Sequence, residues 1–212
     1  MKKYDFDEII DRRNTNAVKV EACRSMFGTS DVIPLWVADM DFRTPDFILE
    51  SIRKRCEHPI LGYSVPPRDY FTSIIYWLKE NHDWEVKKEW LGFMPGVVPG
   101  LSFAVQQFTA ENDEIVIQPP VYFPFMHVVE KNNRKLIFNP LKEIDGKFQM
   151  DFDDLEKKIT SKTKMLILCN PHNPGGRSWE KETLLQLAEI CFKHGLLVVS
   201  DEIHADMALP GN

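Results

Sequence analysis

An acidic side chain stands beside an apolar run near the end of this sequence. Asp201 follows Leu196–Val199 directly after Ser200. A carboxylate this close to a core is costly unless it is paired or hydrogen-bonded, so we expect a cationic group opposite it. The candidates within the chain are an arginine or lysine from elsewhere, or His204. A capping or surface role for Asp201 is the alternative.

A glycine- and proline-rich segment, "MPGVVPGL", opens directly into a stretch with helical periodicity. The backbone N–H groups of Val97 and Val98 would then be free at a helix N-terminus, where an anion such as a phosphate binds well. A turn with a purely structural role explains the same segment when it is considered alone.

Two further segments place chemistry-bearing side chains after apolar runs. In "QPPVYFPF" the prolines stiffen the backbone around Tyr122, whose ring could stack on a flat ligand or serve as a core or rim residue. In "CNPHNPGG" two Asn-Pro steps predict an extended loop of little freedom that presents the carboxamide of Asn173. Turn chemistry alone could also explain this second segment.

Together the four segments suit one ligand, a planar, phosphorylated ring that contains nitrogen. Pyridoxal 5'-phosphate has each of these features. Asp201 would keep the pyridine nitrogen protonated, Tyr122 would lie against the ring, and Asn173 would bind the 3-oxygen. A metal site formed by Cys169, His172 and His204 is a weaker alternative, because these residues are not in zinc-finger spacing.

These residues require a scaffold of alternating helices and strands. Thr44-Pro45, an N-cap followed by proline, predicts a helix near residues 45–57. Apolar periodicity predicts helices near 67–82, 99–109 and 178–194, the last capped by Ser178 and ended by Gly195. Short apolar runs predict strands at 114–118, 134–138, 164–169 and 196–200. The last two strands and their helix form a βαβ unit, and strands this apolar imply a mainly parallel sheet covered on both faces. The class is therefore α/β, in which ligands bind at the carboxyl ends of the strands.

Composition narrows the possible partners and the domain plan. The 212 residues carry a formal charge of −6 without a basic stripe, which argues against nucleic acid. No apolar run approaches the roughly 20 residues of a membrane span, and four cysteines without CxxC spacing indicate reduced thiols in a cytoplasmic protein. We expect an N-terminal arm or part of a smaller domain at 1–45, a helical lead-in at 46–90, and a ligand-binding large domain at 91–212.

The ordered motifs resemble a known family. The sequence is similar to the fold-type-I pyridoxal-phosphate enzymes of the class I/II aminotransferase superfamily, and in particular to its cystathionine β-lyase-like (carbon–sulfur lyase) branch. The motifs that carry this resemblance are "DFDEIIDRRNTNAVK", "PLWVADMDF", "ILGYSVPP", "PGVVPGL", "QPPVYFPF", "NPHNPGG" and "SDEIH".

The resemblance implies a role for each matching residue. Tyr122 and Asp201 would be the catalytic residues in this part of the enzyme, and the cofactor pyridoxal phosphate would be bound by the set Tyr63, Val97, Val98, Tyr122, Asn173, Asp201 and His204. Tyr63 resembles a tyrosine that reaches the phosphate of a neighbouring subunit, which implies a homodimer. The role of His204 is left open, because the broader aminotransferases carry tyrosine there.

The resemblance also implies an activity, and an absence. The activity is α,β-elimination from cystathionine- or cysteine-type amino acids to a keto acid, ammonia and a thiol. The Schiff-base lysine and the carboxylate-binding arginine of the family are expected after Asn212, so the chain looks like an N-terminal half whose C-terminal part is absent. Lys162 and Lys164 lie just before and at the start of a strand, which is the wrong edge of the sheet for this role. Transamination on the same scaffold and a non-catalytic truncated fragment are the alternatives.

Overall fold

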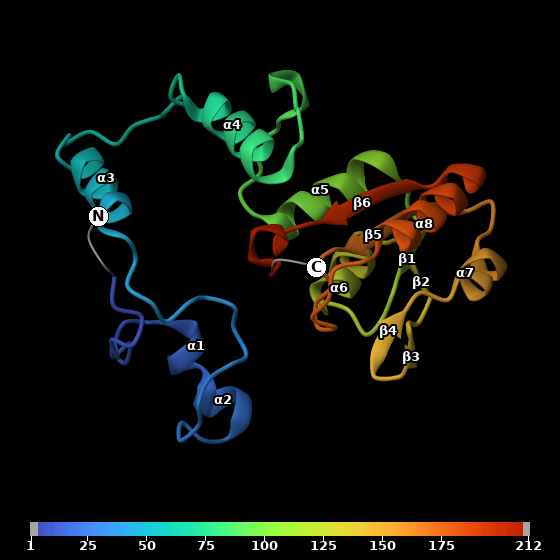
Figure 1. Cartoon of the computed structure of the whole chain (residues 1–212), viewed down its shortest axis with the longest axis horizontal. Helices are drawn as coiled ribbons and strands as arrows, with labels where there is room; N and C mark the ends of the chain where they lie inside the picture. Colours follow the sequence, from blue (N-terminus) through green and yellow to red (C-terminus); the bar gives the residue numbers. More distant parts are fainter. Residues whose placement is uncertain (1–3, 210–212) are drawn as a thin grey trace. The chain divides into compact units, whose positions relative to one another are not determined.

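The computed structural model describes residues 4–209. These residues belong to two units, Met1–Asp83 and Trp84–Asn212 (Figure 1). The predicted domain limits at residues 45 and 90 stay predictions. Within the described chain, no helix is both long and apolar enough to cross a membrane.

The first unit contains four helices and, among its described residues, little core of its own. The helices are α1 (Val18–Glu21), α2 (Cys23–Phe27), α3 (Asp46–Cys56) and α4 (Tyr70–His82). Of the apolar side chains in residues 4–83, only that of Cys23 is buried. Helix α4 begins later than the predicted residue 67, because Pro67 and Arg68 lead into a turn instead.

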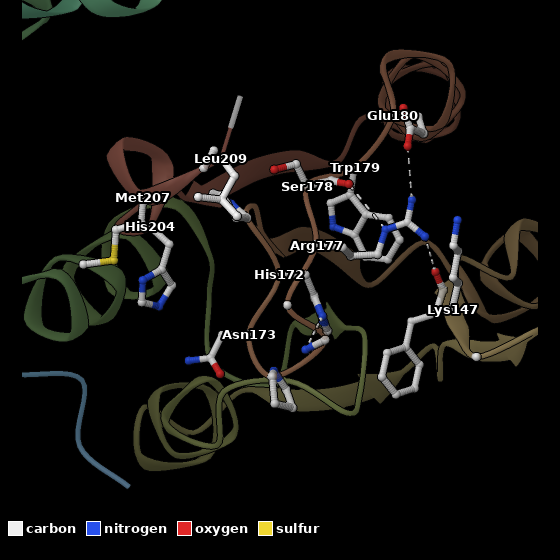
Figure 2. Close-up of a pocket in the computed structure, with 17 residues that line it drawn as sticks. Lys147, His172, Asn173, Arg177, Ser178, Trp179, Glu180, His204, Met207 and Leu209 are labelled. Carbon is white, nitrogen blue, oxygen red and sulfur yellow. Dashed lines mark hydrogen bonds and ion pairs between the residues drawn. The ribbon is translucent and has the colours of Figure 1, made fainter. Parts of the chain in front are cut away.

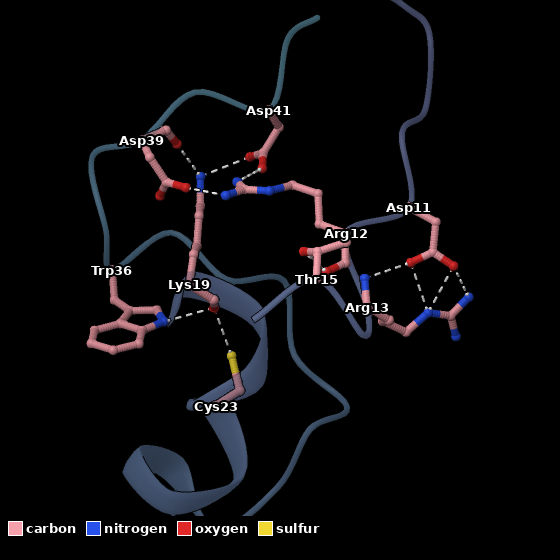
Figure 3. A network of polar contacts seen from close by, with 9 residues as sticks. All are labelled: Asp11, Arg12, Arg13, Thr15, Lys19, Cys23, Trp36, Asp39 and Asp41. Atoms are coloured by element: carbon pink, nitrogen blue, oxygen red, sulfur yellow. Dashed lines mark hydrogen bonds and ion pairs between the residues drawn. The ribbon is translucent and has the colours of Figure 1, made fainter. Parts of the chain in front are cut away.

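A polar network orders the N-terminal part of this unit (Figure 3). The buried Lys19 donates from Nζ to the carbonyl of Asp39 at 2.8 Å and to Oδ2 of Asp41 at 2.7 Å. Arg12 pairs with both of these aspartates, and the indole of Trp36 donates to the carbonyl of Lys19 at 3.0 Å. The network therefore ties residues 36–41 to α1 through charge-assisted hydrogen bonds.

The second unit is built on a parallel sheet in the order β2-β1-β5-β6. Its strands are β1 (Glu114–Ile117), β2 (Lys135–Phe138), β5 (Thr163–Cys169) and β6 (Leu197–Asp201). Helix α8 (Lys181–His194) joins β5 to β6, which confirms the predicted βαβ unit. All four predicted strands are present, and so is the α/β class.

Alternating side chains divide the core between the two faces of the sheet. On β5, Met165, Ile167 and Cys169 belong to one apolar cluster, together with residues of α5 (Val97–Phe108) and α6 (Pro124–Lys131). Leu166 and Leu168 belong to a second cluster, together with residues of α7 (Phe152–Lys158) and α8. The period of two along a strand thus produces three layers, with helices covering both faces of β1 and β5 (Figure 1).

The edge strands depart from the expectation of full coverage. Leu197 and Val198 of β6 remain 40% and 37% exposed, and Phe138 of β2 is also exposed. Each of these strands pairs with only one neighbour among the described residues. An apolar run therefore predicted the strand correctly but not the burial of both of its faces.

Several elements differ from the sequence-based expectations. Helix α8 begins at Lys181 with Glu180 as its N-cap, so the predicted Ser178 cap is wrong, whereas Gly195 does end the helix at a φ of 66°. Helices α6 and α7 were not predicted. Nor was the hairpin of β3 (Lys142–Ile144) and β4 (Lys147–Gln149), which packs no continuous apolar face. Two short 3-10 helices, η1 (Lys88–Trp90) and η2 (Ala205–Met207), complete the unit.

Candidate cofactor site at the carboxyl edge of the sheet

Asp201 is a buried carboxylate at the end of β6. Its side chain accepts a hydrogen bond from the N–H of Ile203 at 3.1 Å, and the residue is only 7% exposed. Within residues 4–209 no basic side chain forms an ion pair with it, so neither an arginine, a lysine nor His204 is the cationic partner expected from the sequence. A buried carboxylate with this single hydrogen bond is suited to a cationic ligand.

Strand geometry determines the face on which this carboxylate lies. Val199 packs against the α5/α6 cluster, and Asp201, two residues further along, points to the same side. Cys169 belongs to that cluster and is the register partner of Asp201 across β5 and β6. The carboxylate therefore lies at the carboxyl end of the sheet face that α5 and α6 cover.

The N-terminus of α5 lies at the same edge of the sheet. The helix ends at Phe108, and residues 109–113 lead from there to the start of β1, so its other end is directed toward the carboxyl ends of the strands. The N–H groups of Val97 and Val98 belong to the first turn, where no preceding helical carbonyl is available to them. Val98 packs against the same apolar cluster as Cys169. The free N–H groups of Val97 and Val98 and the Asp201 carboxylate thus lie on the same face of the sheet, at the carboxyl ends of its strands.

Tyr122 lies between β1 and α6, just beyond the strand end. Its ring centroid is 6.2 Å from that of the fully buried Phe125 and 5.5 Å from that of Phe123. The Tyr122 side chain is 37% exposed. A ring anchored on one side and open on another can stack on a planar ligand.

The loop after β5 is tighter than the extended loop predicted from its prolines. His172 donates its N–H to the carbonyl of Arg177 at 2.6 Å, and Gly176 donates to the carbonyl of His172 at 2.8 Å. These two bonds close residues 172–177 into a turn, which pairs part of the loop's own backbone. The partly exposed carboxamide of Asn173 makes no hydrogen bond to any described residue, which leaves it available to a ligand.

A pocket of about 760 Å³ lies beside this loop. Figure 2 shows Asn173 and His204 on one side of it, with Lys147 and Arg177 on the other. The structure thus brings the predicted residues Asn173 and His204 to one pocket. The remaining predicted residues of this unit, Val97, Val98, Tyr122 and Asp201, do not line it.

Two titratable side chains near Asn173 are held in their neutral forms. Burial raises the pKa of the Cys169 thiol, and the Asp201 carboxylate raises it further, against the opposing effect of the Asn173 N–H. Burial lowers the pKa of His172, and the Arg177 charge lowers it further. A neutral thiol and a neutral imidazole can both accept hydrogen bonds, and no motif in the sequence predicts these two roles.

The remaining candidates lie elsewhere. Tyr63 is fully exposed and belongs to the first unit, so its predicted contact with a cofactor phosphate stays a prediction. Lys162 and Lys164 lie at the amino end of β5, opposite to Asp201, as expected. In the described part of the chain, no group of three or more histidine, cysteine, aspartate or glutamate residues is placed to hold a metal ion, so the Cys169–His172–His204 alternative is not supported.

Comparisons with known proteins agree with this architecture. Cystathionine β-lyase PatB of Bacillus subtilis is 49% identical over 209 residues, which cover 98% of this chain and 54% of that protein. A pyridoxal-phosphate-bound putative aminotransferase from Clostridium difficile 630 superposes with a TM-score of 0.94 at 45% identity, over 99% of this chain and 54% of that one. A pyridoxal-phosphate-bound C–S lyase from Staphylococcus hominis gives a TM-score of 0.91 at 39% identity, over 100% and 54%.

The chain therefore spans about half the length of the relatives that it matches. The family model described as aminotransferase class I and II matches residues 30–211, which include the sheet, α5 and the loop that carries Asn173. The fold, the matched range and the identity to these relatives agree, and we conclude that the chain belongs to the class I and II aminotransferase family.

Proposed function

We propose that this chain supplies the cofactor-binding part of a pyridoxal-phosphate-dependent carbon–sulfur β-lyase that acts on cystathionine- or cysteine-type amino acids. The observation that carries the proposal is the position of Asp201. It is a buried carboxylate without a basic partner among residues 4–209, on the sheet face that α5 covers.

The side chains present fit this cofactor. The N–H groups of Val97 and Val98 would bind its phosphate, because the first turn of a helix favours an anion. The Tyr122 ring would lie against the pyridine ring. Asn173 would donate to the 3-oxygen, with His204 on the same side of the pocket.

Asp201 would pair with the protonated ring nitrogen. A nearby opposite charge typically shifts a pKa by about 1 to 3 units, which keeps that nitrogen cationic at neutral pH. When bound, pyridoxal phosphate supplies an electron sink for a carbanion at the substrate α-carbon. The contribution of this chain is to hold the ring in place and to maintain its charge.

A homodimer is part of the proposal. Large apolar side chains of the first unit, including Ile33, Leu35 and Ile60, are at least 70% exposed. Large apolar side chains that gather into one exposed patch are typical of protein interfaces, and we propose that these do. A second copy would cover these side chains, and Tyr63 would then reach the phosphate of that copy.

Light scattering of the purified protein tests the dimer. A monomer at working concentration would count against the dimer.

Transamination is the second candidate, because the Clostridium difficile relative is described as a putative aminotransferase. The protein, together with any coding sequence that follows Asn212, should be expressed and assayed with both kinds of substrate. Pyruvate released from cystathionine without a keto-acid acceptor supports the lyase. Amino transfer that depends on an added keto acid, without pyruvate release, supports the aminotransferase.

A non-catalytic fragment is the third candidate. Borohydride treatment of the cofactor-loaded protein, followed by mass spectrometry, distinguishes it from an enzyme. A permanently attached cofactor indicates a functional lysine. An unmodified chain that is also inactive in both assays would leave the fragment as the remaining explanation.

A further inference from the structure

The loop that presents Asn173 has few backbone donors, and every one of them is used. Pro171 and Pro174 have no N–H, which leaves five donors between residues 170 and 176. Three of these N–H groups donate to backbone carbonyls: Asn170 to Asp201 at 3.0 Å, His172 to Arg177 at 2.6 Å, and Gly176 to His172 at 2.8 Å. The other two donate to side chains: Asn173 to Sγ of Cys169 at 3.3 Å, and Gly175 to Nδ1 of His172 at 3.2 Å.

Two of these five acceptors are side chains, and one of them belongs to the preceding strand. Sγ of Cys169 accepts the N–H of Asn173 and donates to the carbonyl of Pro171 at 3.5 Å. The thiol therefore contacts the loop on both sides of His172. Because the residue is 6% exposed, water does not readily replace these bonds.

The thiol itself is held firmly in place. Cys169 is the last residue of β5 and packs in the α5/α6 cluster with Ile117 and Ile167. Its carbonyl accepts the indole N–H of the buried Trp179 at 3.0 Å. A side chain that the sheet and the core hold in place can restrict the motion of the amide that donates a hydrogen bond to it.

We propose that Cys169 is a positioning residue for Asn173, and that its thiol fixes the loop so that the carboxamide of Asn173 faces the ligand site. The proposal rests on the proposed function as far as the ligand is concerned. The hydrogen bond that carries it is a property of the chain alone, and it can be tested without a ligand.

The first experiment measures amide hydrogen exchange at Asn173 in the ¹⁵N-labelled 212-residue chain by NMR. Cys169→Ala removes the acceptor and should speed exchange at Asn173 by about 2- to 10-fold, the range expected for one net hydrogen bond. Cys169→Ser retains a donor and an acceptor and should restore exchange to near the wild-type rate. Cys191→Ala is the matched control, since Cys191 is also buried but lies on α8, away from the loop.

Two outcomes overturn the proposal. One is exchange at Asn173 that is equally fast in Cys191→Ala and Cys169→Ala, which would indicate a general loosening of the core. The other is exchange at the rate of an unstructured amide in the wild-type chain, which needs no variant and so remains informative if Cys169→Ala fails to fold.

The second experiment measures the dissociation constant for pyridoxal phosphate in protein extended past Asn212. Cys169→Ala should weaken binding by about 2- to 10-fold and shift the visible absorbance band, and Cys169→Ser should reverse both effects. Unchanged binding and an unchanged band in Cys169→Ala would contradict the positioning role. A wild-type protein that binds no pyridoxal phosphate would contradict the proposed function instead, and the exchange result would still decide whether Cys169 holds the loop.

Discussion

Cys169 and Asp201 are register partners at the carboxyl ends of β5 and β6, and their side chains lie on the same face of the sheet. The carboxylate raises the pKa of the thiol beyond the effect of burial alone. A thiolate at this position would stand beside a second negative charge, so the thiol stays protonated. The carboxyl ends of β5 and β6 thus place the buried carboxylate of Asp201 beside a neutral thiol that donates to the loop.

Replacement of Asp201 by Asn should lower the pKa of the Cys169 thiol. The carboxamide is similar in size but carries no charge, so the repulsion that disfavours the thiolate is removed. The ultraviolet absorbance of the thiolate during an alkaline titration measures the change. Cys191, whose pKa burial raises to about 11, provides the internal control and should titrate as in the wild type. An unchanged pKa of the Cys169 thiol in Asp201→Asn would show that the carboxylate and the thiol do not interact.

Replacement of Asp201 by Ala should abolish lyase turnover in protein extended past Asn212. In the proposed site the carboxylate would keep the pyridine nitrogen of the cofactor protonated, and its removal would leave the Val97 and Val98 amides, which would bind the phosphate, unchanged. Pyruvate release measures turnover, and competition by inorganic phosphate measures binding. Turnover near the wild-type level would contradict the role assigned to Asp201.

His172 should make stability depend on pH. Burial lowers its pKa below the value of about 6.5 expected for an unfolded chain, so the unfolded state binds protons first as the pH falls. Its contribution to stability is complete above about pH 6.5 and is lost as the pH falls through the lower folded-state pKa. Urea unfolding at a series of pH values measures this loss.

His172→Gln should flatten that dependence below neutral pH, because glutamine does not titrate. The control is His58→Gln, since His58 is exposed on the first unit. The same loss of stability in His172→Gln as in the wild type would show that other groups cause it.

Substitution of Gly175 by Ala should destabilise the loop. A Cβ at this position would overlap Nδ1 of His172 and lie 3.1 Å from the ring of Phe148. Overpacking of this kind costs about 1–3 kcal/mol. Thermal unfolding measures the loss, and Gly92→Ala is the control because no atom lies within 4 Å of its added Cβ. Equal melting temperatures for the two variants would be inconsistent with this packing.

Replacement of Trp179 by Phe should destabilise the second unit by about 1–3 kcal/mol, the cost of leaving a buried polar group unpaired. Phenylalanine keeps an apolar ring at this position, but the carbonyl of Cys169 loses the hydrogen bond that the indole N–H donates to it at 3.0 Å. The free energy of unfolding in urea measures this cost. Trp84→Phe replaces a half-exposed tryptophan and should alter the free energy of unfolding only slightly. A smaller effect at Trp179 than at Trp84 would refute the argument.

Much of the scaffold could be predicted from local patterns. Short runs of five or six residues located all four strands of the sheet. The 3.6-residue period located α5 and α8, because burial of one side of a helix imposes that period on the sequence. The pair Asp145–Gly146 is typical of a two-residue hairpin turn, and both residues do adopt positive φ between β3 and β4. This hairpin was therefore also predictable from the sequence. Helix α6 does carry helical spacing, since Phe125, Val128 and Val129 stand at i, i+3 and i+4 and are all buried, whereas the seven residues of α7 bury only Leu155.

The sequence by itself determined the α/β class, the strands and the residue types that suit a phosphorylated ring. Only the tertiary structure decided that Asp201 lies on the face covered by α5, that Asn173 and His204 share a pocket, and that Cys169 holds the Asn173 loop. The reason is physical. Periodicity records which side of an element is buried, whereas the hydrogen bonds of a loop depend on which acceptors distant strands bring within reach.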